Sequence, residues 1–400
     1  MSYSITDVKE YVREEDVKFI RLAFCDVDGK LKNASVMPSE LDRAFQCGVS
    51  FDGSAIKGFQ KQEKSDLLLF PDPDTLTLLP WRPSHGKVIR LFCDVKTPDG
   101  KAYELDSRNV LKKAIEYARK EGVTCNFGSE FEFYLFKTDE NGARTKEPSD
   151  SAGYMDVAPE DKGENVRREI CLTIEEMGLY PECSHHEEGP GQNEIDFRYS
   201  DPLSSADHAV IFKNATEIIA NKNGLWATFD PKPLAGKSGS GMHVNVSVQK
   251  DDGEDVFDSF VAGVLRRLKE NTFFFNPVQE SYKRLGEMKA PNRVCWANQN
   301  RSTAIRIPAT SGQKRFELRS PDGTANPYLA YALVIYSGIE GVKDKLKLPP
   351  EFSGNAFFCD EAEKLPFDLK SAYEIVSASE FVKKHIPDKF LKNASGERNL

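Results

Sequence analysis

The sequence predicts an α+β protein with a small domain over residues 1–100 and a larger domain over residues 101–400. Three observations support this prediction. The chain has 400 residues, enough for one large domain and a smaller one. Several short strands surround a single helix in the first hundred residues, and the strong turn signal Thr97-Pro98-Asp99-Gly100 follows them. Alternating strands and helices then continue to the end of the chain.

Composition excludes several classes of protein. The formal net charge of -9 argues against nonspecific nucleic-acid binding, which requires a basic surface. No apolar run approaches the ~20 residues of a membrane span, and the N-terminus has no signal segment. The eight cysteines have no CxxC spacing, so neither a zinc site nor a disulfide framework is predicted. We expect a cytoplasmic protein without nucleic-acid or membrane partners.

Local patterns predict the elements of the first domain. A helix is expected over residues 1–15 and a strand over 17–24, followed by a strand and then a helix within 31–47. That helix begins at Pro38, with Ser39 a possible cap. Further strands are expected at 67–70, 76–79 and 88–92, after a glycine-punctuated loop over 51–59.

The second domain alternates between helices, strands and three loops. Residues 137–160 are polar and predict a loop, residues 230–241 form a glycine-rich loop, and residues 282–291 predict another loop. Strands are expected at 125–136, on both arms of a Gly-Pro-Gly hairpin within 184–198, and at 242–248, 300–308 and 313–320. Helices are expected from Ser107 and at 166–177, 206–221, 258–269 and 327–347, with helical patches after 349.

The strand over 125–136 places unlike residues on its two faces. Phe127, Phe131 and Phe133 alternate with Glu130 and Glu132, so an aromatic face is buried and two carboxylates share the other face. Neighbouring carboxylates repel unless a positive charge lies between them. A solvated strand face is the plain alternative for any one of these glutamates.

The half-polar pattern recurs four more times downstream. Glu187 and Glu194 converge across the predicted hairpin. His243 lies on the polar face of the strand 242–248, and Glu317 lies between Arg315 and Arg319 on the last strand. The tripeptide Gly236-Lys237-Ser238 is not a P-loop, because the required earlier glycine is replaced by Pro231 and a strand follows.

These polar faces together predict metal-dependent phosphoryl transfer. Five carboxylates with one imidazole suit hard divalent cations, magnesium or manganese, rather than zinc. Arginine makes two-pronged contacts with phosphate and carboxylate groups that lysine makes less well. Two metals with several arginines indicate an enzyme that uses ATP. The candidate metal ligands are Glu130, Glu132, Glu187, Glu194, His243 and Glu317, and the arginines are Arg284, Arg301, Arg306, Arg315 and Arg319.

The same segments resemble the glutamine synthetase family of bacterial and archaeal type over nearly the whole chain. The set in this order is highly specific, although each string alone is weak. The matching strings are Phe51-Asp52-Gly53-Ser54, Glu130-Phe131-Glu132, His185-His186-Glu187 through Gln192-Asn193-Glu194, Gly239-Ser240-Gly241-Met242-His243, Asn300-Arg301-Ser302 to Arg306-Ile307-Pro308, and Glu317-Leu318-Arg319.

The resemblance implies an activity and a role for each residue. The family forms γ-glutamyl phosphate from ATP and glutamate, and ammonia then displaces the phosphate. By this resemblance one Mg²⁺ or Mn²⁺ ion is held by Glu132, Glu187 and Glu194, and a second by Glu130, His243 and Glu317. Glutamate is bound by Arg284, Arg319, Gly239 and Ser238. ATP and its transferring phosphate are held by Arg301, Arg306 and Arg315, with Asn245 and Ser247 assigned to the nucleotide.

The resemblance also implies fold and assembly. The expected fold is a β-grasp-like N-terminal domain followed by a catalytic α/β domain with a curved antiparallel sheet. The family assembles as rings, usually dodecamers of two stacked hexamers, with active sites between neighbouring subunits. Asp52 of the next subunit would bind and deprotonate ammonium.

Several residues depart from the family pattern. Ser238 replaces the usual Asn, and Asn245 replaces a His found in many members. Lys289 occupies the place of the loop glutamate that closes over the ammonium site, and Glu287 is the nearby acid that could substitute. An organic amine in place of ammonia is therefore an alternative, and a noncatalytic protein on the same scaffold is a third. We expect Glu317→Ala to abolish turnover while leaving the fold largely intact.

Overall fold

The computed structural model describes residues 3–82, 85–309, 312 and 314–397, without the side chains of 393–397. The chain divides into two compact units, residues 1–110 with 172–179, and residues 111–171 with 180–400. The boundary predicted near residue 100 precedes the first of these junctions. Among the helices of the described residues, none combines the length and apolar character needed to cross a membrane.

The first unit is built on a six-stranded sheet with the order β2-β1-β6-β4-β3, and β5 pairs with β6. The β1–β6 pair is parallel, and the other pairs are antiparallel. Its elements are α1 (Ile5–Glu14), β1 (Val17–Cys25), β2 (Leu31–Val36), η1 (Pro38–Glu40), α2 (Leu41–Cys47), β3 (Val49–Asp52), η2 (Gly53–Ala55), η3 (Gln62–Lys64), β4 (Asp66–Pro71), η4 (Pro73–Thr75), β5 (Thr77–Leu78) and β6 (Lys87–Lys96).

These elements confirm the strands and the two helices predicted for this part of the chain, with two corrections. The loop expected over 51–59 begins inside β3, which ends at Asp52. Ser39 does not cap a helix, because it lies inside the single 3-10 turn Pro38–Glu40 that precedes α2. The turn at Thr97–Gly100 is present, where the Gly100 amide donates to the Thr97 carbonyl over 2.8 Å.

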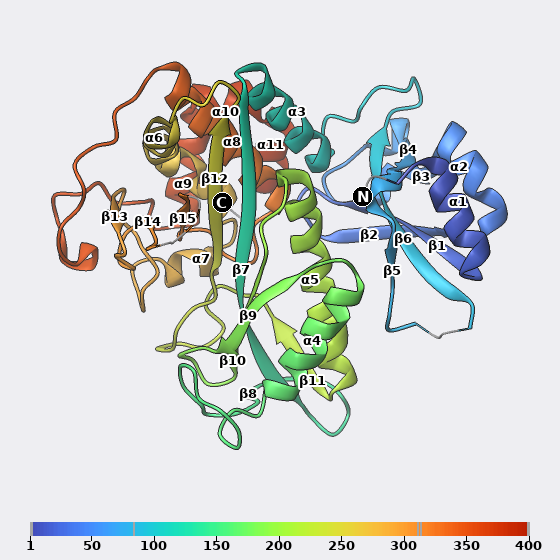
Figure 1. The fold of residues 1–400 in the computed structure, drawn as a ribbon, viewed down its shortest axis with the longest axis horizontal. Coiled ribbons are helices and arrows are strands. Elements are labelled where there is room, and N and C mark those ends of the chain that lie inside the picture. The colour runs from blue at the N-terminus through green and yellow to red at the C-terminus, as the bar shows by residue number, and fades with distance from the viewer. Residues whose placement is uncertain (1–2, 83–84, 310–311, 313, 398–400) are drawn as a thin grey trace. The chain divides into compact units, whose positions relative to one another are not determined.

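The second unit is organised around β7 (Val123–Thr138), the long teal strand of Figure 1. The nine-stranded sheet has the order β13-β14-β15-β12-β7-β10-β9, and β8 and β11 also pair with β7. Its strands are otherwise β8 (Arg144–Pro148), β9 (Pro181–His186), β10 (Gln192–Phe197), β11 (Leu225–Thr228), β12 (Met242–Lys250), β13 (Trp296–Asn298), β14 (Ile305–Ile307) and β15 (Phe316–Leu318). Every pair is antiparallel except β13–β14.

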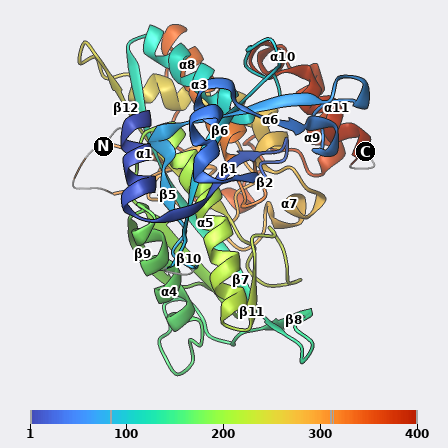
Figure 2. The same cartoon turned by 90° about the vertical axis from the view of Figure 1, so that its right-hand side faces the viewer.

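Helices flank this sheet. The buried helices α6 and α8 pack against each other, and α5 runs beside β7 and β11 (Figure 2). The helices after β6 are α3 (Ser107–Lys120), α4 (Glu164–Glu176), α5 (Pro202–Lys222), α6 (Phe257–Phe275), α7 (Gln279–Arg284), α8 (Pro327–Lys343), η5 (Ala356–Phe358), α9 (Leu369–Ala378), α10 (Glu380–His385) and α11 (Asp388–Glu397). Of these, α3 and α4 have residues in both units.

An aromatic cluster fixes the orientation of β7. Phe131 and Phe133 are fully buried, and their rings lie within 5.3–6.1 Å of the rings of Phe197, Phe212 and Phe229. Large aromatic side chains dominate the apolar area that a core removes from water. Because residues alternate along a strand, burying these rings directs Glu130 and Glu132 to the opposite face.

Five predictions for the second unit need correction. Residues 137–160 are not all loop, because β7 extends to Thr138 and pairs with the exposed strand β8. The predicted loop at 282–291 begins inside α7, and the helix at 258–269 extends to Phe275 because its last turn is still buried. The strands at 300–308 and 313–320 are shorter, and Gln313 lies outside the described residues.

Candidate functional site

The sheet register brings the predicted acidic residues together. On β7, Glu130 is directly opposite His243 of β12, and Glu132 is directly opposite Glu194 of β10. Directly opposed residues of an antiparallel pair place their side chains side by side on one face of the sheet. Residues more than sixty positions apart in the chain therefore share one polar surface, as predicted.

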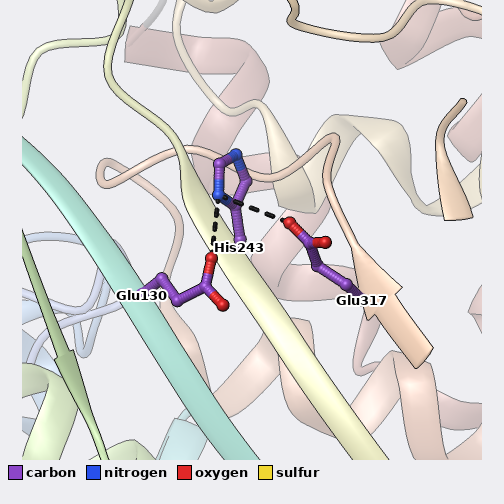
Figure 3. Close-up of side chains that lie close together, drawn as sticks. All are labelled: Glu130, His243 and Glu317. Atoms are coloured by element: carbon purple, nitrogen blue, oxygen red, sulfur yellow. Dashed lines mark hydrogen bonds and ion pairs between the residues drawn. The ribbon is translucent and has the colours of Figure 1, made fainter. Parts of the chain in front are cut away.

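The first cluster consists of Glu130, His243 and Glu317 (Figure 3). His243 Nδ1 lies 3.3 Å from Glu130 Oε2 and 3.7 Å from Glu317 Oε1. Glu317 belongs to β15, which pairs with β12 beside His243. The ligand atoms of the three side chains all lie within 4.8 Å of one another, close enough to share one ion.

Two arginines hold Glu317 in this cluster. Arg306 Nη1 donates to Glu317 Oε2 over 2.6 Å, and Arg319 Nη1 donates to Glu317 Oε1. Burial alone would raise the pKa of Glu317, but the charge of Arg319, followed by His243 and Arg306, lowers it to about 2. Glu317 is therefore ionised, and its carboxylate is oriented before any ligand arrives.

A second cluster surrounds Glu194. His185 Nε2 lies 3.2 Å from Glu194 Oε1, and His185 Nδ1 lies 3.8 Å from Glu187 Oε1. Glu132 joins from β7, where its Oε1 lies 4.0 Å from His243 Nε2 and its Oε2 accepts from the Gly241 amide over 2.6 Å. The three predicted ligands of this metal are thus linked through Glu194, but His185 lies among them.

The electrostatics of this second cluster favour a bound cation. Burial, together with the charges of Glu132 and Glu194, raises the pKa of Glu187 to about 7. The hydrogen bond to Glu194 outweighs burial and raises the pKa of His185 to about 9. The positive charge of protonated His185 reduces the repulsion among these carboxylates, and a divalent ion would reduce it in the same way. Carboxylate-rich donor sets of this kind fit magnesium or manganese.

Asp196 is a residue that the predicted site omitted. It is opposite Glu130 on β10, and it shares a face with Glu194 because the two are separated by two positions. Burial, then the charge of Glu194 and further acidic neighbours, raises the pKa of Asp196 to about 9. Asp196 lies two residues after Glu194, and this strand spacing was the signal in the sequence that could have identified it. His185 lies two residues before Glu187, and the same spacing could have identified it as well.

Two of the predicted glutamate-binding residues, Gly239 and Arg319, lie against a third, the buried Arg284. Arg284 is 2% exposed, and it donates to the carbonyls of Ser320 over 2.9 Å and Arg319 over 3.2 Å. A Cβ at Gly239 would lie 2.8 Å from Arg284 Cγ and 2.4 Å from the Pro231 carbonyl, so only glycine fits there. Ser238 precedes it, and its hydroxyl donates to Glu188 over 3.2 Å.

Three of the residues predicted for the nucleotide, Asn245, Arg306 and Arg315, connect to the first cluster. Asn245 Nδ2 donates to Glu130 Oε1 over 2.7 Å, and Arg315 Nε donates to Asn245 Oδ1 over 3.0 Å. Ser247 follows on the same strand and is buried. Arg301 is exposed, and its charge acts on the Tyr154 hydroxyl. Arg306 and Arg315 thus both connect to the first cluster, through Glu317 and Asn245 respectively.

The loop after α7 is held by two ion pairs. Lys289 pairs with Glu188, next to Glu187, while Glu287 turns away to pair with Lys232 over 2.9 Å. Met288 and Lys289 have φ values of 45° and 68°, a left-handed conformation that side-chain residues seldom adopt. The acid closest in sequence to Lys289 is therefore committed to another partner.

Asp52 belongs to the first unit. It ends β3, and its carboxylate accepts hydrogen bonds from the Ser54 amide over 2.8 Å and the Ser54 hydroxyl over 2.6 Å. These bonds, the hydroxyl first, lower the pKa of Asp52. The carboxylate is exposed and oriented.

Comparisons with known proteins agree with this architecture. Residues 16–98 match the family model of the glutamine synthetase β-grasp domain, and residues 104–395 match that of the glutamine synthetase catalytic domain. The first match confirms the predicted β-grasp fold, and the antiparallel sheet around β7 confirms the predicted α/β domain.

Relatives at high identity span nearly the whole chain. A glutamine synthetase of Methanosarcina mazei is 46% identical over 94% of this chain and 89% of its own. One of Clostridium saccharobutylicum is 44% identical, with 96% and 92% covered.

Solved structures share the fold. A structure titled as a GmaS/ADP complex has a TM-score of 0.89 at 28% identity, covering 98% of this chain and 95% of its own. Plasmodium falciparum glutamine synthetase has a TM-score of 0.88 at 22% identity, covering 100% and 96%. With both domains matched and identities above 40% over nearly the full length, the chain belongs to the glutamine synthetase family of ligases.

Proposed function

We propose that this protein ligates ammonia to L-glutamate with the energy of ATP, giving L-glutamine, ADP and phosphate through γ-glutamyl phosphate. The convergence of Glu130, His243 and Glu317 on one face of the sheet, with Arg306 and Arg319 beside them, carries the proposal. Acids and arginines in one place are what phosphoryl transfer to a carboxylate requires.

Two groups of residues would hold two Mg²⁺ or Mn²⁺ ions. Glu130, His243 and Glu317 would hold one, and Glu132, Glu187 and Glu194 would hold the other. The ions supply positive charge that offsets the charge of the transferring phosphoryl group. The raised pKa of Glu187 supports the second assignment, because a bound cation would remove the repulsion that raises it.

Arginines and backbone would bind the substrates. Arg301, Arg306 and Arg315 would hold ATP and its transferring phosphate, while Asn245 and Ser247 would lie beside the nucleotide. The structural relative titled as an ADP complex supports nucleotide binding. Arg284, Arg319, Gly239 and Ser238 would bind glutamate, and Asp52 would act on the ammonium ion. Glu287 would join Asp52 only after its ion pair with Lys232 opens.

Assembly and location follow the family. We propose a homo-oligomer with active sites between subunits, in which Asp52 of a neighbouring subunit completes each site. A dodecamer of two hexameric rings and a cytoplasmic location stay predictions.

The test is nucleotide turnover. Purified protein with Mg²⁺, ATP and glutamate is expected to release ADP rapidly only when ammonium is added, with glutamine formed in equal amount. Glu130→Gln serves as the control for contaminating activity and is expected to lose turnover. ADP release independent of ammonium would refute the proposal.

An organic amine is the second candidate, because Lys289 places a positive charge on Glu188, the residue that follows Glu187. Such a charge repels ammonium and organic ammonium ions alike, but an organic amine can offset the repulsion with apolar contacts that ammonium cannot make. A panel of ethanolamine, polyamines and ammonium distinguishes the two. Lys289→Glu is expected to lower the KM for ammonium, while Lys283→Glu, an exposed lysine on α7, is the matched control.

A further inference from the structure

A buried network of charged side chains contacts the turn that carries Glu187. It consists of Asp150, Asp161, Arg167 and His186, none of which belongs to the proposed ligand set. Its side chains are almost inaccessible: His186 is 0% exposed, Asp150 and Asp161 are each 1% exposed, and Arg167 is 6% exposed. Buried ionisable groups are costly unless they are paired and hydrogen-bonded. These four pair as two acids with two bases.

His186 connects this network to Glu187. Its Nδ1 lies 2.7 Å from the Glu187 carbonyl oxygen, and its Nε2 lies 2.9 Å from Asp150 Oδ1. Both partners are acceptors, so both ring nitrogens donate. An imidazole that donates from both nitrogens has no lone pair for a metal. Although Asp150, Asp161 and His186 are close enough to form a ligand cluster, the ring is committed to hydrogen bonding.

The same network holds the rest of the turn. Asp150 Oδ1 also accepts from the Gly191 amide over 2.8 Å. Arg167 Nη1 donates to Asn193 Oδ1 over 2.7 Å, and Asn193 Nδ2 donates to the Gly191 carbonyl over 2.9 Å. Gly191 has a φ of +68°, and a Cβ there would lie 2.7 Å from the Leu135 carbonyl. The network thus binds the turn at the Glu187 carbonyl and at both the amide and the carbonyl of Gly191.

Among the acids of the second cluster, Glu187 needs this support most. Glu132 and Glu194 lie within paired strands, whereas Glu187 follows the end of β9. The Glu187 amide donates to the Gln192 carbonyl over 2.8 Å, which continues the pairing between the two arms of the hairpin. The Glu187 carbonyl, in contrast, lies in the turn. A ligand on a turn has its position set by what holds that turn.

We propose that His186 and Asp150 are positioning residues that hold the Glu187 peptide so that its carboxylate lies beside Glu194 and can share a divalent ion with it. This inference rests on the proposed metal role of Glu187. His186 acts through Glu187 and does not touch the ion.

Two substitutions of His186 separate its two hydrogen bonds. The Asn amide nitrogen overlaps Nδ1, so His186→Asn keeps the bond to the Glu187 carbonyl. The Gln amide nitrogen overlaps Nε2, so His186→Gln keeps the bond to Asp150 and loses the one to Glu187. We expect His186→Gln and Asp150→Asn to weaken Mn²⁺ binding about 10- to 100-fold, a range typical of residues that orient metal ligands. His186→Asn should lie closer to wild type.

The full-length protein is titrated with Mn²⁺, and free Mn²⁺ is measured by electron paramagnetic resonance. The activation constant for the metal and the KM for ATP are measured on the same variants. The activation constant should rise in His186→Gln while the KM for ATP stays unchanged. Tyr328→Phe, which removes a buried hydrogen bond to Asp207 elsewhere in this unit, is the control for lost stability and should bind Mn²⁺ normally. Equally tight Mn²⁺ binding by His186→Gln, Asp150→Asn and wild type would overturn the inference.

Glu187→Gln distinguishes this failure from failure of the proposed metal site. If Glu187→Gln binds Mn²⁺ as wild type does, the metal role of Glu187 is wrong and the inference falls with it. If Glu187→Gln binds weakly while both positioning variants bind normally, only the positioning role is refuted.

Discussion

Replacing Glu317 with alanine should damage stability as well as turnover. The Glu317 side chain is 1% exposed and lies between Arg319, 3% exposed, and Arg306, 17% exposed. Removing one partner of a buried ion pair leaves an uncompensated charge and costs roughly 3–5 kcal/mol. These ion pairs therefore revise the expectation drawn from the sequence that the fold would be largely unaffected.

Glu130→Ala provides the matched comparison, because Glu130 belongs to the same cluster. Its side chain is 23% exposed and accepts a hydrogen bond from Asn245. Losing a partly exposed hydrogen bond costs about 1 kcal/mol. Both variants should lose at least about a hundredfold in turnover, as removal of a charge-stabilising group does in other enzymes. Only Glu317→Ala should lose several kcal/mol of unfolding free energy.

The assay is urea unfolding in EDTA at one fixed protein concentration, beside ADP release with saturating substrates. EDTA removes the metal, so loss of metal binding does not contribute to the difference in unfolding free energy. Equal urea midpoints for the two alanine variants would refute the buried ion-pair argument. Wild-type turnover in Glu317→Ala would remove Glu317 from the metal ligands.

Three further outcomes follow from the geometry. Mn²⁺ at a hundred times its dissociation constant should stabilise the wild type by about 2.7 kcal/mol, and Glu194→Gln should lose most of that gain in a thermal melt. Burial lowers the pKa of His385 to about 4, and the ring stacks on Tyr336 at 4.0 Å. The unfolded chain then binds the extra proton, so stability should rise from pH 4 to pH 6.5; His385→Phe should flatten that slope, and an unchanged slope would contradict the assignment. Gly239→Ala should raise the KM for glutamate, because the new Cβ overlaps Arg284 Cγ and the Pro231 carbonyl; Gly153→Ala, where the nearest atom is 3.5 Å away, should not.

Much of the fold could be predicted because strand faces are encoded locally. The alternation of Phe131 and Phe133 with Glu130 and Glu132 is a property of adjacent residues, and burial of the rings then decides where the acids point. The strand β8 escaped prediction because it is exposed and polar, so it lacks the apolar alternation that marks a half-buried strand.

The sequence by itself determined which residue types face which way, and hence that acids and one imidazole gather on a sheet surface. The tertiary structure alone decided which distant charge each acid meets: Glu317 meets Arg306, Glu194 meets His185, and Glu188 meets Lys289. The physical reason is that side-chain periodicity depends on adjacent residues, whereas the last of these partners is a hundred positions away. Such pairings depend on strand register and loop conformation, which only the packed core fixes.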